Sequence, residues 1–459
     1  MEMTGSTSAL ARADSEHHIH AFADLSTLKK KGAHIFCKGK GVKVWDSIGN
    51  EYLDAISGMW CVGLGYGDTV LADIAQSQLA SFSYCPVFND KTSDVAVLLC
   101  EKIANLRKDG LRKVMFVNSG SEANDTALKM VWYFNNARGL QGKKAIVTFD
   151  RAYHGSTIAA ASLTALPHMH ASFDLPIFPV IRVPSPDIRK IENGRNMNSD
   201  EIVEALTAPV IAEIEQYGPD RVGAFFAEPV LGAGGVIIPP QKFYAKLQEY
   251  LRKNDILLVL DEVITGFGRT GELFGADAFE ISPDITTMAK NLTSGYLPMG
   301  AVMLSDEIYE VIEKESERIG TFATGMTYSG HPVSSAVALE CLSRYGSPQF
   351  LGNVRALGTV LEDALSAHSR NNVTNLRRIG LLAAVDIVTQ GLGHDEERDM
   401  KFAATVVRIA LKYGVILRAV GNTIVFCPPF ISSPEEIRNM VYRFGEAVDE
   451  AFRETIVWC

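Results

Sequence analysis

The chain has 459 residues, of which 47% are hydrophobic and 21% charged, and its formal net charge is −10. This composition is typical of a globular protein with a large apolar core, and the acidic balance disfavours a nucleic-acid partner, which would require a basic face. The 7 cysteines never occur as C-x-x-C, which favours free thiols over disulfides or a zinc site. No apolar run approaches the roughly 18 residues of a membrane span, and no apolar leader opens the chain, so we expect a cytoplasmic protein.

The first part of the chain is expected to be a loose terminus followed by a small β-meander. Residues 1–16 are polar and small. The histidine-rich run at 17–20 has no H-E-x-x-H pattern and no nearby carboxylate pair, so it predicts no metal site. Between residues 33 and 53, short strand-like runs are separated by turns at Gly39 and Gly41, and further on at Gly49.

The middle of the chain alternates helical periodicity with short apolar runs. Six of these runs are candidates for buried strands: 114–117, 145–149, 179–183, 223–227, 256–260 and 301–305. Continuous apolar strands separated by helices predict a mainly parallel sheet that is covered on both faces.

The last part of the chain, after residue 332, is predicted to be an α+β unit. Its helices are expected at about 333–344, 350–368 and 397–413, and its strands near 376–387, 416–420 and 423–427. Ser433 and Glu436 predict a capping box at the start of a final helix.

A helix start that suits a phosphate follows the strand at 113–117. Ser119, Gly120 and Ser121 lie where the strand ends and a helix begins, so backbone N–H groups, hydroxyls and the helix dipole would meet there. By itself the pattern is more typical of an ordinary N-cap. There is no G-x-x-x-x-G-K-[ST], so a nucleoside triphosphate is not the expected ligand.

Two carboxylates and an aromatic residue follow other predicted strands. Asp261 and Glu228 each end a buried apolar run, and Tyr153 with His154 follows a third. A carboxylate at the end of a buried strand is costly unless it meets a cation or donor, such as a protonated heteroaromatic nitrogen. A structural salt bridge would explain either carboxylate alone. A flat side chain at this edge of the sheet can cover a planar ligand.

Lys290 lies between a short strand-like run and the breakers Ser294 and Gly295. An ammonium group in such apolar company is costly to bury, and a desolvated lysine amine can form a Schiff base with a carbonyl cofactor. Alone it would be taken for a surface lysine. Together, the phosphate-type helix start, two carboxylates, an aromatic lid and an isolated lysine fit one cofactor, pyridoxal phosphate.

Six segments resemble one family, in order along the chain: NSGSEAND, AYHGST, AEPVLGAGGV, LDEVITGFGRTG, MAKNLTSGYLPMGA and TYSGHP. They identify the sequence as a member of the class III (omega) aminotransferases. The resemblance implies an α/β protein of fold type I, the pyridoxal-phosphate-dependent transferase fold. Its large domain (61–332) would hold a mostly parallel seven-stranded sheet and the cofactor. A smaller α+β domain would come from both chain ends, 1–60 and 333–459.

The resemblance also implies roles for single residues. Lys290 and Asp261 would be catalytic: Lys290 would bind the cofactor and move the proton, and Asp261 would keep the pyridine nitrogen protonated with Glu228 in support. The wider cofactor-binding set would be Ser119, Gly120, Ser121, Tyr153, His154, Val263 and Thr327. Thr327 would reach the phosphate in the neighbouring subunit, so the active unit would be a homodimer. No metal is expected.

The segments HHIHAFAD, SGMWCVGLGY and GVILRAVGNTIVFCPPF are most similar to the amine:pyruvate and β-alanine or taurine:pyruvate transaminases. By this similarity Arg418 would bind the carboxylate of the acceptor. Trp60, Phe88, Tyr153 and Leu231 would line the substrate pocket, with Leu231 standing where many relatives carry Gln.

The activity implied is ping-pong transfer of an amino group from a primary amine or ω-amino acid to pyruvate. A decarboxylase or an aminomutase on the same fold is the alternative. The need for a keto-acid acceptor distinguishes the transaminase from both. A non-enzymatic cofactor-binding module is disfavoured because no site residue is missing.

Overall fold

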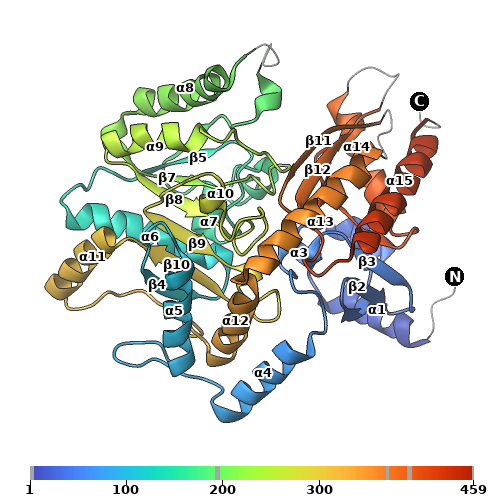
Figure 1. Cartoon of the computed structure of the whole chain (residues 1–459), viewed down its shortest axis with the longest axis horizontal. Helices are drawn as coiled ribbons and strands as arrows, with labels where there is room; N and C mark the ends of the chain where they lie inside the picture. The colour runs from blue at the N-terminus through green and yellow to red at the C-terminus, as the bar shows by residue number, and fades with distance from the viewer. Residues whose placement is uncertain (1–4, 192–196, 368–371, 390–394, 457–459) are drawn as a thin grey trace.

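The computed structural model describes residues 5–191, 197–367, 372–389 and 395–456, and its larger part is built on a seven-stranded sheet (Figure 1). The strand order is β4-β10-β9-β8-β7-β5-β6. The strands are β4 (Lys113–Val117), β5 (Ala145–Phe149), β6 (Val180–Val183), β7 (Val222–Ala227), β8 (Leu257–Asp261), β9 (Ile285–Met288) and β10 (Gly300–Leu304). β10 is antiparallel to both of its neighbours, and the other neighbouring pairs are parallel. The mostly parallel seven-stranded sheet is therefore confirmed.

Alternate side chains of these strands pack into two separate apolar cores. On β7, Ala224 and Phe226 pack in the core that includes α6, whereas Phe225 and Ala227 pack in the core on the other face. The helices of this part are α4 (Thr69–Ser81), α5 (Asp94–Leu106), α6 (Gly120–Ala137), α7 (Ile158–Leu163), α8 (Ser199–Tyr217), α9 (Phe243–Lys253), α10 (Gly275–Ala278), α11 (Asp306–Ile319) and α12 (Pro332–Tyr345). Burial on both faces explains why the strands are continuously apolar.

The two chain ends lie together beside the large sheet (Figure 1). The predicted meander is present as β1 (Phe36–Lys40), β2 (Lys43–Asp46) and β3 (Glu51–Asp54), and β13 (Val415–Ile416) pairs in parallel with β3. A second sheet has the order β11-β12-β15-β14. Its strands are β11 (Val373–Ile379), β12 (Leu382–Ile387), β14 (Arg418–Val420) and β15 (Thr423–Phe426). The smaller unit built from both chain ends is thus confirmed, while the domain limits at 60 and 332 stay a prediction.

The remaining helices connect and cover these sheets. They are α1 (Gly5–His17), α2 (Leu25–Lys31), the short distorted α3 (Ser57–Trp60), α13 (Pro348–Ala367), α14 (Glu396–Ala410) and α15 (Pro434–Ile456). The predicted capping box of α15 is formed. The Glu436 N–H donates to Ser433 Oγ at 3.2 Å, and the Ser433 N–H donates to Glu436 Oε2 at 2.8 Å. No described helix combines the length and apolar character needed to cross a lipid bilayer.

Two local predictions in the N-terminal part were wrong. Residues 5–17 form helix α1 rather than a loose terminus, because Ala9, Leu10 and Ala11 favour a helix despite the polar company. Gly39 lies inside β1 rather than in a turn, and the chain turns at Gly41. Gly39 is required by a neighbour: a Cβ there would come within 2.7 Å of the Tyr66 ring.

Candidate active site

The predicted chemical residues meet at one edge of the large sheet. β4, β5, β7, β8 and β9 run in the same direction, so their carboxyl ends lie together. Open α/β sheets bind ligands at this edge. The edge is therefore where the helix start after β4, the loop after β5 and the carboxylates after β7 and β8 converge with Lys290.

Asp261 is held by three neighbours. The residue is 4% exposed. Oδ2 accepts from Asn124 Nδ2 at 2.7 Å and lies 2.9 Å from His154 Nδ1, and Oδ1 accepts from the Val263 N–H at 3.0 Å. His154 Nε2 lies 3.2 Å from the hydroxyl of Thr148, which can donate to it while Nδ1 carries the proton. Both carboxylate oxygens are thus fixed, with lone pairs left for a further donor.

Asn124 is the residue that the sequence analysis missed. It is fully buried, and besides Asp261 its Nδ2 donates to the His154 carbonyl at 2.6 Å while its Oδ1 accepts from Thr287 Oγ1 at 2.9 Å. The available signal was a polar residue on the buried face of α6, next to Ala123. Every polar atom of the side chain has a partner, so the amide orients Asp261 rigidly.

We expect Asn124→Ala to lower the free energy of unfolding by about 1–3 kcal/mol, because it leaves buried partners such as the Thr287 hydroxyl unsatisfied. Denaturant unfolding monitored by fluorescence measures the change. The matched control is Asn136→Ala, an exposed position on the same helix, where a change within about 0.5 kcal/mol is expected. Equal effects of the two substitutions would contradict the role of Asn124.

Glu228 supports the site through the backbone rather than through Asp261 directly. Oε1 accepts from the Tyr153 N–H and Oε2 from the Gly232 N–H, both at 3.0 Å. Burial raises the pKa of Glu228 to about 7, and the nearby carboxylate of Asp261 adds to this rise. Its role is to fix the loop that carries Tyr153.

Lys290 follows β9 at the same edge and begins a short 3-10 turn, Lys290–Leu292. Its φ of +46° is in the left-handed region, which a non-glycine residue seldom adopts. Burial lowers the pKa of Lys290, and the charge of Asp261 is the largest opposing influence. A lowered pKa leaves more of the amine neutral and nucleophilic. Nζ lies 5.5 Å from the centroid of the Trp60 ring.

The start of α6 is open to an anion. Ser119 caps the helix by accepting from the Glu122 N–H at 3.1 Å. Within the described ranges no acceptor faces the N–H groups of Gly120 and Ser121. A Cβ at Gly120 would come within 3.0 Å of the Val263 methyl groups, so glycine is needed for this close approach. These free donors and the helix dipole suit a phosphate.

The side chains of Trp60 and Arg418 lie against each other. The Arg418 guanidinium carbon lies 4.8 Å from the Trp60 ring centroid. Burial lowers the pKa of Arg418, and Tyr153 opposes this change. Across the parts of the chain that the structure describes, no carboxylate pairs with Arg418.

The remaining predicted site residues are Leu231, Phe88 and Thr327. Leu231 is fully buried and its backbone pairs with Ile237. Phe88 is 42% exposed. It lies beside Gly325, where an added Cβ would come within 3.0 Å of the Phe88 ring. Thr327 is exposed and its carbonyl accepts from the Tyr84 hydroxyl at 3.0 Å. No contact described for Phe88 or Thr327 reaches Lys290 or Asp261, and the roles of both residues stay predictions.

Comparison with known proteins identifies the family of this site. The family model described as aminotransferase class-III matches residues 28–448. The chain belongs to the class-III aminotransferases.

Its relatives in this family are similar over most of their length. The putrescine–pyruvate aminotransferase of Pseudomonas aeruginosa is 37% identical over 439 residues, which are 95% of this chain and 94% of that protein. The mitochondrial gamma aminobutyrate transaminase 1 of Solanum lycopersicum is 37% identical over 416 residues, 90% of this chain and 81% of that protein. The omega transaminase of Pseudomonas jessenii in complex with PMP matches with a TM-score of 0.92 and 34% identity, over 97% of this chain and 99% of that one.

Class-III aminotransferases depend on pyridoxal phosphate, and the residues of this aminotransferase fit that cofactor. The free donors at the start of α6 suit its phosphate, the fixed carboxylate of Asp261 suits a protonated ring nitrogen, and Lys290 supplies an amine of lowered pKa. The predicted cofactor, enzyme class and fold type I are thus confirmed.

Proposed function

We propose that this aminotransferase transfers an amino group from a primary amine or ω-amino acid, such as β-alanine or taurine, to pyruvate. The observation that carries the proposal is the partly buried Arg418 guanidinium, which lies against Trp60 without a described carboxylate partner. A bidentate guanidinium is well suited to the carboxylate of a keto acid. Relatives named for putrescine with pyruvate and for gamma aminobutyrate support a donor with a terminal amine.

When bound, pyridoxal phosphate supplies an aldehyde that exchanges amines and a ring that accepts the electron pair released at the donor carbon. Lys290 Nζ would hold the cofactor covalently, and after displacement would move a proton from the donor carbon to the aldehyde carbon of the cofactor. Asp261 would hold the proton on the ring nitrogen through its remaining lone pairs. The backbone N–H groups of Gly120 and Ser121 would bind the phosphate.

Three further residues would complete the cofactor pocket. Tyr153 and Val263 would cover the two faces of the ring. Val263 is suited to this because it also packs against Gly120, where a Cβ would meet its methyl groups at 3.0 Å. His154 would act through Asp261, to which it is hydrogen-bonded at 2.9 Å.

A half-reaction screen tests this function. Each amine donor is mixed with the holoenzyme without an acceptor, and conversion of the cofactor absorbance is followed. Pyruvate should then restore the starting spectrum. Release of carbon dioxide would favour the decarboxylase alternative, product without an acceptor would favour an aminomutase, and cofactor binding without any half-reaction would favour a non-enzymatic module.

We expect Arg418→Ala to raise the KM for pyruvate by about 10–100-fold, since a hydrogen bond to a charged group contributes about 1.5–3 kcal/mol. The KM for an uncharged amine should change far less. Steady-state kinetics with both substrates varied measures the effect, and Arg438→Ala, an exposed arginine on α15, is the matched control. Equal changes for pyruvate and the amine would remove Arg418 from acceptor binding.

We also propose a homodimer in which Thr327 reaches the phosphate of the partner's cofactor. Three aromatic side chains around residues 325–328 are exposed: Tyr84 (39%), Phe88 (42%) and Tyr328 (62%). Such exposed aromatic surface favours an interface. Light scattering should give twice the chain mass of 50.1 kDa. A monomeric, active enzyme would contradict the assembly. A cytoplasmic location is likewise proposed, in keeping with the free thiols of the described cysteines.

A further inference from the structure

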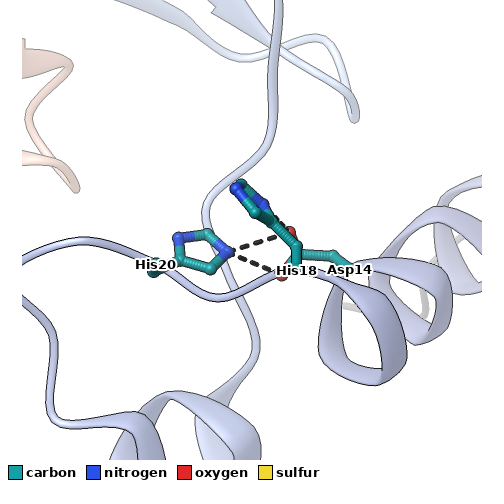
Figure 2. A group of neighbouring side chains, drawn as sticks. All are labelled: Asp14, His18 and His20. Carbon is teal, nitrogen blue, oxygen red and sulfur yellow. Dashed lines mark hydrogen bonds and ion pairs between the residues drawn. The ribbon is translucent and has the colours of Figure 1, made fainter.

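A cluster of metal-ligating side chains lies at the end of α1, far in the sequence from the cofactor residues. Figure 2 shows His18 and His20 directed at the carboxylate of Asp14. His18 Nδ1 lies 3.0 Å from Asp14 Oδ1, and His20 Nε2 lies 2.9 Å and 3.0 Å from the two carboxylate oxygens. The sequence predicts no metal here, because the histidine run has no H-E-x-x-H pattern and no nearby carboxylate pair. The fold of α1 brings Asp14 to these histidines.

The spacing of these atoms suits a first-row divalent cation. One ligand atom from each of the three side chains can be chosen so that all lie within 4.8 Å of one another. Ligand atoms around a four-coordinate zinc ion lie about 3.4 Å apart, since each bond is about 2.1 Å. Small side-chain rotations would therefore bring the three atoms to bonding distance. The side chain of His18, 64% exposed, is free to make such a rotation.

The local backbone presents the three ligands on one side. Asp14 and His18 are four residues apart, and the His18 N–H donates to the Asp14 carbonyl at 3.0 Å, so the helical register places both side chains on one face. His20 returns from the turn that follows. The side chains of Asp14 and His20 are 19% and 26% exposed, so the carboxylate and one imidazole are partly shielded from water.

The donor set also favours a cation chemically. Without one, a single carboxylate accepts from two imidazoles whose ring centroids are only 4.3 Å apart, and both rings must place a proton toward it. A divalent cation would take the place of those protons. It would be bound by two neutral imidazole nitrogens and one carboxylate oxygen. Imidazole with carboxylate is a ligand set for zinc and neighbouring transition metals.

We propose that Asp14, His18 and His20 form a zinc site, with water completing the coordination. The metal would join the last turn of α1 to the chain that leads into α2, and so would order the N-terminal segment. The site goes beyond the transamination reaction and makes no use of the cofactor residues.

Metal titration of the untagged, dialysed holoenzyme tests the site. Zinc is added in competition with a chromophoric chelator, and wild type is compared with His20→Ala and Asp14→Asn. Each variant should bind one zinc fewer per chain or bind it at least about tenfold more weakly, since even residues that only orient a metal ligand change affinity by roughly 10–100-fold. The matched control is His17→Ala, an adjacent histidine outside the cluster whose side chain is 78% exposed.

Cobalt provides a second readout that separates this site from the free cysteines. Co²⁺ bound by imidazole and carboxylate absorbs in the visible range, and thiolate ligands add intense near-ultraviolet bands. A visible spectrum that lacks thiolate bands in wild type and disappears in both His20→Ala and Asp14→Asn supports the site. Identical zinc stoichiometry and affinity in wild type and His20→Ala, or loss in His17→Ala equal to that in His20→Ala, would overturn it.

Discussion

Lys290→Ala is expected to abolish transamination and covalent attachment of the cofactor. The amine that binds the cofactor and moves the proton is the same group, so no other side chain replaces it. The loss should approach the roughly 10⁶-fold effect of removing a covalent nucleophile from an enzyme. The structure supports this expectation because burial lowers the pKa of Lys290, although the charge of Asp261 partly opposes this. A lowered pKa makes the amine a better nucleophile. Single-turnover kinetics with an amine donor measures the loss.

A second measurement locates the covalent bond. After borohydride reduction, intact-mass spectrometry of wild type should show the added mass of one cofactor per chain, and Lys290→Ala should show none. The control is Lys144→Ala. Burial also lowers the pKa of Lys144, but this residue precedes β5 at the opposite edge of the sheet. Retained cofactor mass in Lys290→Ala, or its loss in Lys144→Ala, would contradict the assignment.

Asp261→Asn is expected to slow the half-reaction by on the order of 10²–10³, the usual cost of removing one preorganised electrostatic group. Asparagine keeps the volume but removes the negative charge that would hold a protonated ring nitrogen. The asparagine amide would also lie next to the side chains of Asn124 and His154, which both direct donors at residue 261. Rapid-mixing kinetics at saturating donor measures the effect on the chemical step.

The matched control for this prediction is Asp284→Asn, just before the neighbouring strand β9. Asp284 precedes β9 at the opposite edge, where its Oδ2 accepts from the Leu258 N–H at 2.7 Å, and asparagine can keep that bond. Burial raises the pKa of Asp284 to about 6, so this control tests another carboxyl that is already partly desolvated. Half-reaction rates that agree within twofold between Asp261→Asn and wild type would refute the role of Asp261.

The strands and the strand-end residues could be predicted because each depends on short-range patterns. A buried parallel strand is a run of apolar residues, and the polar residue after it must lie at the sheet edge. That reasoning places Ser119, Asp261 and Glu228 from the sequence alone, and β7 and β8 match their predicted bounds to within a residue or two.

The remaining features depend on contacts between distant segments. Asn124 is oriented by Asp261, His154 and Thr287 from three other strand ends, and nothing local to α6 shows that convergence. Glu228 was expected to support Asp261, and the hydrogen bonds that it accepts from the Tyr153 and Gly232 backbone depend on how two loops meet.

Helix α6 fixes the distance between the expected phosphate site and Asp261. Its first residues, Gly120 and Ser121, have the free N–H groups, and one turn later Asn124 donates a hydrogen bond to Asp261. A helix rises by about 1.5 Å per residue and does not stretch, so the separation between the anion-holding end and the acid is set by the backbone itself. Vitamin B6 analogues with a lengthened or shortened phosphate arm should therefore reach either the N–H groups at the start of α6 or the carboxylate of Asp261, but not both.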